Sequence, residues 1–175
     1  MRYEINELAS LLSRTPSVVC DLLKDLPEEL VRSNEGGDTW TPFDVVGHLI
    51  HGEKTDWIPR AKIILGDDAD KTFEPFDRFA QFVESEGKPL ADLLDEFEAL
   101  RTENLRELAS MDISEEDLKK TGIHPELGEV TLSELLATWA AHDLDHIVQI
   151  SRTIANQYGK AVGPWKAYLR VLQKT

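Results

Sequence analysis

His142 and His146 occupy the middle of an apolar stripe in a predicted helix near the end of the chain. The other residues of the stripe have helical spacing, and they are Leu132, Leu135, Leu136, Trp139, Ile147, Ile150 and Ile154. Residues four apart lie one turn from each other on one helix face, so both rings could bind one ion at about 2.0–2.1 Å. Imidazole suits zinc, nickel, iron or copper. The pair therefore predicts a site for a divalent transition metal.

A second interpretation is a pair of core histidines that bond to the backbone or to carboxylates. A buried imidazole without a partner costs roughly 1–3 kcal/mol, so the position in the stripe requires partners of some kind. A metal site would need a third ligand, and the predicted second helix offers His48 and His51. These two lie on opposite flanks of the apolar stripe of that helix, and periodicity does not choose between them. His124 lies in a segment rich in glycine and proline before the last long helix and is predicted to be a surface residue.

Four further residues are candidates for contacts around the metal or in a pocket. Glu53 lies near the centre of the apolar stripe of the predicted second helix. It could be an oxygen ligand of the metal, a hydrogen-bond acceptor for a ligating histidine, or a buried carboxylate neutralised by an arginine. Asp44, one turn before His48, could orient that ring or could be an exposed first-turn carboxylate that the helix dipole favours. Trp139 and Gln149 share the face of His142 and His146. Asp143 and Asp145 point about 100° away from this face, toward solvent or neighbouring helices.

Turn signals and apolar periodicity predict the elements that must position these residues. The first helical segment is expected over 5–13 and restarts at 15, with Thr15 as N-cap, to continue to 26. Further helices are expected over 41–65, 88–110 and 131–157, and a short one over 165–172. Pro59 predicts a kink near Thr55. The segment 121–130 is expected to form a loop or a small hairpin, and Phe73, Phe76, Phe79 and Phe82 a short helix or turn packed over the core. The predicted fold is all-α, an antiparallel four-helix bundle with short accessory helices.

Composition limits the class of protein. The 175 residues fit one domain over 1–175, and 41% hydrophobic residues suffice for a core. The 19 Lys and Arg against 33 Asp and Glu give a net charge of -14, which argues against nucleic acid and anionic membranes as partners. The start of the chain lacks a signal-peptide pattern, so a cytoplasmic location is expected. The lone Cys20 excludes an internal disulfide. The expected partners are a small-molecule substrate and a second copy in a homodimer.

Two stretches of the sequence resemble the DinB/YfiT-like family. Residues 40–49, WTPFDVVGHL, followed by Glu53 and Trp57, are similar to the second-helix motif of that family. Residues 124–132, HPELGEVTL, and 139–150, WAAHDLDHIVQI, are similar to its fourth-helix block. The resemblance implies a four-helix bundle with a divalent metal, such as zinc, nickel or iron, bound by three histidines. In this sequence they fall on His48, His142 and His146.

The resemblance also implies two metal-dependent activities. One is a thiol-dependent S-transferase, in which the metal binds a low-molecular-weight thiol, and the other is a hydrolase, in which it activates water. Arg60, Arg78 and Arg152 could bind the carboxylates of a thiol cofactor, or could form surface ion pairs. A non-catalytic, stress-related bundle that binds metal or a ligand is the alternative, and a scaffold with structural histidines is a third possibility.

Overall fold

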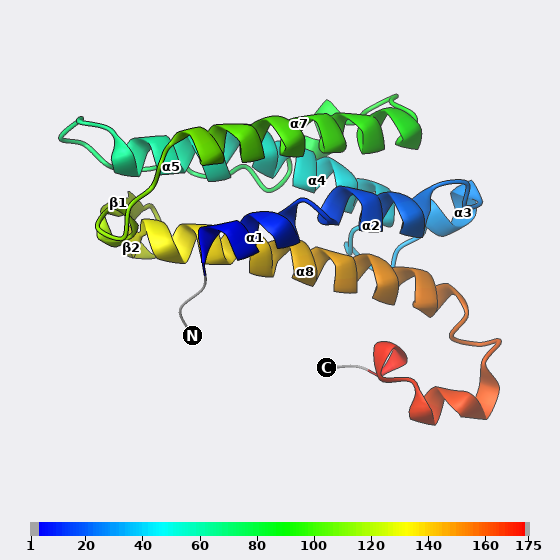
Figure 1. Cartoon of the computed structure of the whole chain (residues 1–175). Coiled ribbons are helices and arrows are strands. Elements are labelled where there is room, and N and C mark those ends of the chain that lie inside the picture. The colour runs from blue at the N-terminus through cyan, green and yellow to red at the C-terminus, as the bar shows by residue number, and fades with distance from the viewer. Residues whose placement is uncertain (1–3, 174–175) are drawn as a thin grey trace.

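Within residues 4–173, which the computed structural model describes, four long helical segments lie side by side (Figure 1). They are α1 (Ile5–Leu12) followed by α2 (Thr15–Leu23), α4 (Pro42–Thr55) followed by α5 (Trp57–Leu65), α7 (Leu90–Ser110), and α8 (Leu132–Gln157). The predicted all-α four-helix bundle is thereby confirmed.

Short elements connect and close these segments. They are α3 (Glu28–Val31), α6 (Ala80–Glu84), the 3-10 turns η1 (Asp117–Lys119), η2 (Gly163–Tyr168) and η3 (Arg170–Leu172), and the antiparallel strands β1 (Thr121–His124) and β2 (Gly128–Thr131). The segment 121–130 is thus a hairpin rather than an open loop. The helix predicted over 165–172 consists of 3-10 turns, and α3 was not predicted.

The long connection between α5 and α7 sets the directions of the helices. This connection returns along α4, against which α6 packs, so α7 runs parallel to α4 and α5 (Figure 1). Lys54 of α4 pairs with Glu96 of α7, and Lys62 of α5 pairs with Glu107 farther along α7. Residue numbers thus increase in the same direction along both segments, as a parallel arrangement requires. The pair formed by α1–α2 and α8 runs in the opposite direction. The segment α4–α5 and α7 are therefore parallel to each other, as are α1–α2 and α8, and these two pairs are antiparallel to one another.

The helix starts and breaks have local causes. Thr41 and Thr131 both form capping boxes, Thr41 with Asp44 and Thr131 with Glu134. The predicted kink is confirmed as a break at Asp56, because Pro59 has no N–H for the carbonyl of Thr55. The prediction for Thr15 was wrong. It is the first residue of α2, and Arg14 before it already has helical backbone angles, so no extended cap residue exists there.

The core of the described residues contains two apolar clusters separated by a polar layer. One cluster, which includes Trp57 and Trp139, lies toward the hairpin end, and the other, which includes Phe97, lies toward α3. Between them, α4, α7 and α8 each contribute buried polar residues: His48, Glu53, Arg101, Asn104, Asp143 and His146. Polar groups at this depth require partners, so the layer is where a functional site is expected.

The four phenylalanines of the connection do not behave alike. Phe73 is buried in the core, as predicted, because its backbone N–H bonds to Ile123 of β1 and fixes it against the bundle. Phe79 and Phe82 are exposed, so the prediction of core packing was wrong for both. Phe82 lies on the five-residue helix α6, and Phe79 is the residue that immediately precedes this helix. No helix among the described residues is long and apolar enough to span a membrane.

Candidate metal centre

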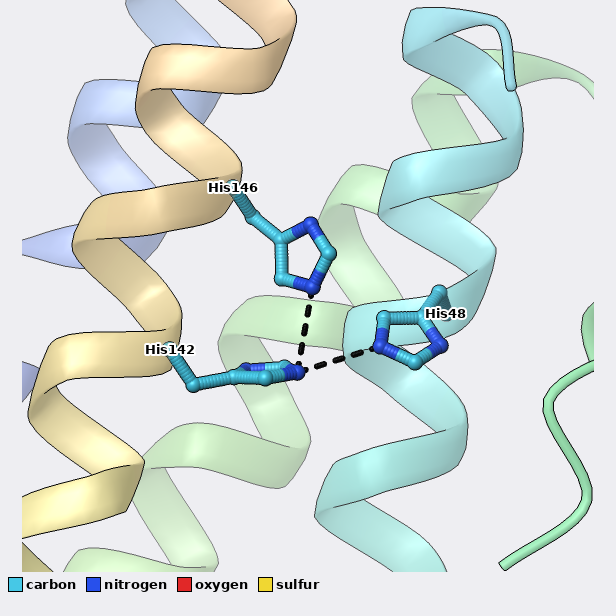
Figure 2. Close-up of side chains that lie close together, drawn as sticks. All are labelled: His48, His142 and His146. Atoms are coloured by element: carbon cyan, nitrogen blue, oxygen red, sulfur yellow. Dashed lines mark hydrogen bonds between the residues drawn. The ribbon is translucent and has the colours of Figure 1, made fainter. Parts of the chain in front are cut away.

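The Nε2 atoms of His48, His142 and His146 converge between α4 and α8 (Figure 2). His142 Nε2 lies 3.1 Å from Nε2 of His48 and 3.0 Å from Nε2 of His146. His48 reaches the cluster from α4, and the other two from successive turns of α8. The structure thus brings together the three predicted histidines, whose role as ligands stays a prediction.

The spacing of these nitrogens fits a common ion. Two nitrogens each about 2.1 Å from a tetrahedral ion lie about 3.4 Å apart, close to the observed separations of 3.0 and 3.1 Å. The cluster found within residues 4–173 has three nitrogen donors, and a three-ligand site would leave coordination positions for water or substrate. The donor set and its geometry therefore suit a catalytic type of site for a divalent transition metal.

The histidines are held in the neutral form that binds metals. Burial, followed by the nearby His146, lowers the pKa of His48 to about 3. Burial, again with His146 as the second cause, lowers the pKa of His142 to about 2. Burial also lowers the pKa of His146, although its hydrogen bond with Gln149 opposes the shift. All three imidazoles therefore offer lone pairs at neutral pH.

Gln149 fixes the orientation of one ring. Its Oε1 lies 2.8 Å from Nδ1 of His146, so Nδ1–H donates to the amide and the lone pair of Nε2 faces the cluster. Asp44 does not act in this way on His48, because its carboxylate bonds the backbone N–H and hydroxyl of Thr41. Nδ1 of His48 and Nδ1 of His142 are buried and have no hydrogen-bond partner within residues 4–173.

Glu53 belongs to a buried network beside the histidines. Its carboxylate accepts hydrogen bonds from Arg101, Asn104 and the indole N–H of Trp139. The interpretation of a carboxylate neutralised by an arginine is therefore the one that the geometry supports. Arg101 and Asn104 were missed in the sequence, although their signal was present. With Phe97, they follow helical spacing on the buried face of α7, where apolar residues are expected.

The remaining histidines lie outside the cluster. His51 is buried, but its Nδ1 lies 3.1 Å from the carboxylate of Glu84 on α6. His124 is half-buried at the end of β1, where its Nδ1 accepts hydrogen bonds from the backbone N–H groups of Glu126 and Leu127. The prediction of a surface position for His124 is therefore only partly right, because its ring also lines a cavity.

A cavity of about 620 Å³ extends from the three histidines to the hairpin. Aromatic rings surround its inner end. The ring centroid of Trp40 is 4.8 Å from that of His48, Phe76 is 5.4 Å from His48, and Trp57 is 5.1 Å from His142. The volume is within the range of small-molecule sites, and all three histidines line the cavity.

The arginines predicted as surface ion-pair partners separate into two groups. Arg152 forms an ion pair with Glu35, and it is not among the residues that line the cavity. Arg78 is exposed but lines the cavity, 4.0 Å from Glu126. Arg60 is buried, which contradicts a surface position. It lines the cavity and pairs with Asp56 across 2.6 Å.

Known proteins are similar to this chain in sequence. The sequence pattern of the DinB superfamily matches residues 11–150. A relative from Bacillus cereus (strain 03BB102), named "Putative metal-dependent hydrolase", is 28% identical over 138 residues, which cover 78% of this chain and 77% of the relative. Proteins that carry the same designation in Bacillus thuringiensis subsp. konkukian (strain 97-27) and Bacillus anthracis (strain CDC 684) are 28% and 27% identical over 138 residues, with the same coverage.

The fold also resembles that of a solved structure. YfiT from Bacillus subtilis is described as "a probable metal-dependent hydrolase with an unusual four-helix bundle topology". It superposes with a TM-score of 0.71 at 17% identity, covering 88% of this chain and 87% of that chain. At this identity the likeness establishes the bundle architecture.

Proposed function

Because this chain belongs to the DinB superfamily, we propose that it is a metal-dependent hydrolase of a small molecule, whose ion is held by His48, His142 and His146. The observation that carries the proposal is the convergence of three neutral imidazole nitrogens at the inner end of a cavity. The names of the relatives from Bacillus support hydrolysis rather than thiol transfer. The cavity volume supports a substrate of small-molecule size.

A divalent ion bound there would supply a Lewis acid that activates water against an amide or ester carbonyl. The residues of the chain prepare this chemistry in three ways. Gln149 aims Nε2 of His146, and burial keeps the imidazoles unprotonated. Trp40, Trp57 and Phe76 form apolar walls that limit the access of bulk water. Glu53 of α4 accepts hydrogen bonds from Arg101 of α7 and from Trp139 of α8, so this network fixes α4 relative to α8.

The proposal can be tested by removing and restoring the metal. Untagged protein would be treated with a chelator, then assayed with a panel of aryl amides and esters after addition of zinc, nickel or ferrous ion. We expect hydrolysis that disappears with the metal and returns with at least one of the ions. The His142→Ala variant should stay inactive after the same additions, because it retains only two of the three nitrogens.

Thiols form the second arm of this experiment. Hydrolysis without any added low-molecular-weight thiol supports the proposal. Turnover of electrophiles that occurs only with such a thiol would overturn it in favour of the S-transferase. Activity that survives complete metal removal would show that the three histidines do not act through an ion. Full metal loading without turnover of any substrate would instead favour the non-catalytic alternative.

A further inference from the structure

Arg60 presents unused hydrogen-bond donors to the part of the cavity remote from the histidines. The residue is 6% exposed, and its Nε forms an ion pair with Oδ1 of Asp56 across 2.6 Å. Nη2 has only a long contact of 3.4 Å with the carbonyl oxygen of Glu74. Nη1 has no hydrogen-bond partner within residues 4–173, yet it is not among the fully buried unpaired atoms. Because Arg60 lines the cavity, these donors are available to a ligand.

His124 adds a donor of known orientation. Its Nδ1 accepts the backbone N–H groups of Glu126 and Leu127 at 3.1 and 3.2 Å, so Nδ1 carries a lone pair. In the neutral ring the proton must then be on Nε2, which becomes a donor. Burial and the charge of Arg60 lower the pKa of His124 and favour this neutral form. The hairpin thus fixes the tautomer of a side chain that lines the cavity.

Phe73 brings these two groups together. The guanidinium carbon of Arg60 lies 5.1 Å from the centroid of the Phe73 ring, and the ring of His124 is edge-on to the same ring at 6.5 Å. Phe73 itself is tied to β1 by its backbone bond to Ile123. Arg60 and His124 therefore both lie against the ring of Phe73 and line the same cavity, and Arg78 adds a further positive charge among the cavity-lining residues.

We propose that Arg60 and His124 bind a terminal carboxylate of the substrate. That the ligand is a substrate rests on the proposed function, whereas the carboxylate-binding site rests on these donors alone. The ion pair with Asp56 does not prevent such binding, because a guanidinium has five N–H donors and the 2.6 Å contact with Asp56 is made by Nε. Planar guanidinium groups match carboxylates through paired hydrogen bonds.

The position of this site defines the substrate class. Arg60 lies about three helical turns beyond His48 along α4 and α5, and its side chain points back toward Asp56. Apolar side chains line the cavity, among them Trp57, Val130 and Leu135. The substrate would therefore be an amide or ester with an apolar or aromatic body between the hydrolysed bond and a carboxylate.

The test compares two probes of nearly equal shape, 3-phenylpropionate and its neutral amide 3-phenylpropanamide. Calorimetric titrations would use metal-free protein, so that the carboxylate cannot bind an ion at the histidines. We expect the acid to bind about tenfold more tightly than the amide, as a charge-assisted hydrogen bond predicts. The ratio should fall to nearly one in Arg60→Gln and should fall severalfold in His124→Ala. Arg152→Gln, at a paired arginine outside the cavity, should keep the wild-type ratio.

Folding of the variants is controlled separately. Arg60→Gln leaves the half-buried Asp56 without its ion-pair partner. If this single variant unfolds at a lower temperature than the wild type, the double variant Asp56→Asn/Arg60→Gln replaces it in the titrations. Equal binding of acid and amide by the wild type would overturn the proposal, as would a wild-type ratio in folded Arg60 and His124 variants. Binding of the acid only to metal-loaded protein would also overturn it. Failure of the hydrolase proposal would appear differently, as absent metal-dependent turnover with an unchanged ratio.

Discussion

Arg101 on α7 binds Asp143 on α8 through two contacts, Nη1 to Oδ2 at 2.6 Å and Nη2 to Oδ1 at 3.0 Å. Asp143 directly follows His142 in the chain. The same guanidinium bonds Glu53 on α4, the helix that carries His48. Burial by itself would lower the pKa of Arg101, but the bonds to both carboxylates outweigh burial and raise it. One buried cation thus connects the two helices that supply the three histidines.

Replacement of this cation should destabilise the fold. In Arg101→Met, Glu53 and Asp143 would remain buried without their shared partner, which typically costs about 3–5 kcal/mol. Urea denaturation of the metal-free protein measures the loss. Arg106→Met is the matched control, because Arg106 is an exposed arginine of the same helix and its ion pair with Glu103 is worth less than about 1 kcal/mol. Equal losses in the two variants would contradict the structural role of Arg101.

The candidate metal ligands can be distinguished from the other histidines by metal content. Wild-type protein should retain about one equivalent of transition metal per chain after dialysis. His48→Ala, His142→Ala and His146→Ala should each lose most of it, because two imidazoles bind an ion far more weakly than three. His51→Ala should retain the metal, since His51 pairs with Glu84. Elemental analysis of untagged protein measures the metal content per chain. Full metal retention by His142→Ala would refute the three-histidine site.

Stability of the metal-free protein should depend on pH through the same residues. The pKa values of His48 and His142 are about 3 and about 2 in the fold, against an ordinary value of 6.5. The unfolded chain therefore binds protons below pH 6.5 that the folded chain does not, so stability is full above 6.5 and is lost as pH falls. Between pH 7 and pH 5 the loss should be roughly 2 kcal/mol for each histidine.

Urea titrations of metal-free protein at the two pH values test this expectation. The His142→Phe variant cannot take up that proton, so its free energy of unfolding should decrease by about 2 kcal/mol less than that of the wild type. His51→Phe provides the comparison at a histidine outside the cluster. An identical decrease in wild type and His142→Phe would mean that His142 is not held neutral by the fold.

Gln149 should tune the affinity for metal without being a ligand. Its amide oxygen accepts the Nδ1–H of His146, and loss of such a contact commonly weakens metal binding 10–100-fold. We therefore expect Gln149→Leu to bind zinc about 10–100-fold more weakly than the wild type in competition with a chromogenic chelator. Gln149→Glu retains an oxygen acceptor and should bind at least as tightly as the wild type. Unchanged affinity in Gln149→Leu would show that the contact is dispensable.

Much of the scaffold could be predicted because its causes are local. Thr41 and Thr131 start helices through bonds to residues three positions away, and Pro59 breaks a helix through its own ring. The local prediction failed at Thr15, where the end of the preceding helix already set the backbone. It failed also at Phe79 and Phe82, because spacing alone does not show which face a short helix turns toward the core.

The sequence by itself determined that His142 and His146 share one helix face, since four residues nearly complete a turn. It also placed polar residues at positions where the helical stripes call for apolar ones, which indicates a buried polar layer. Periodicity did not choose between His48 and His51, and the family resemblance implied His48. The tertiary structure places His48 against this pair and turns His51 toward Glu84, because the choice depends on the rotation of α4 against α8 and α6. The same holds for Arg60 and His124, 64 positions apart in the sequence, which Phe73 and the hairpin bring to one wall of the cavity. Contacts of this kind join segments distant along the chain, and local periodicity contains no information on them.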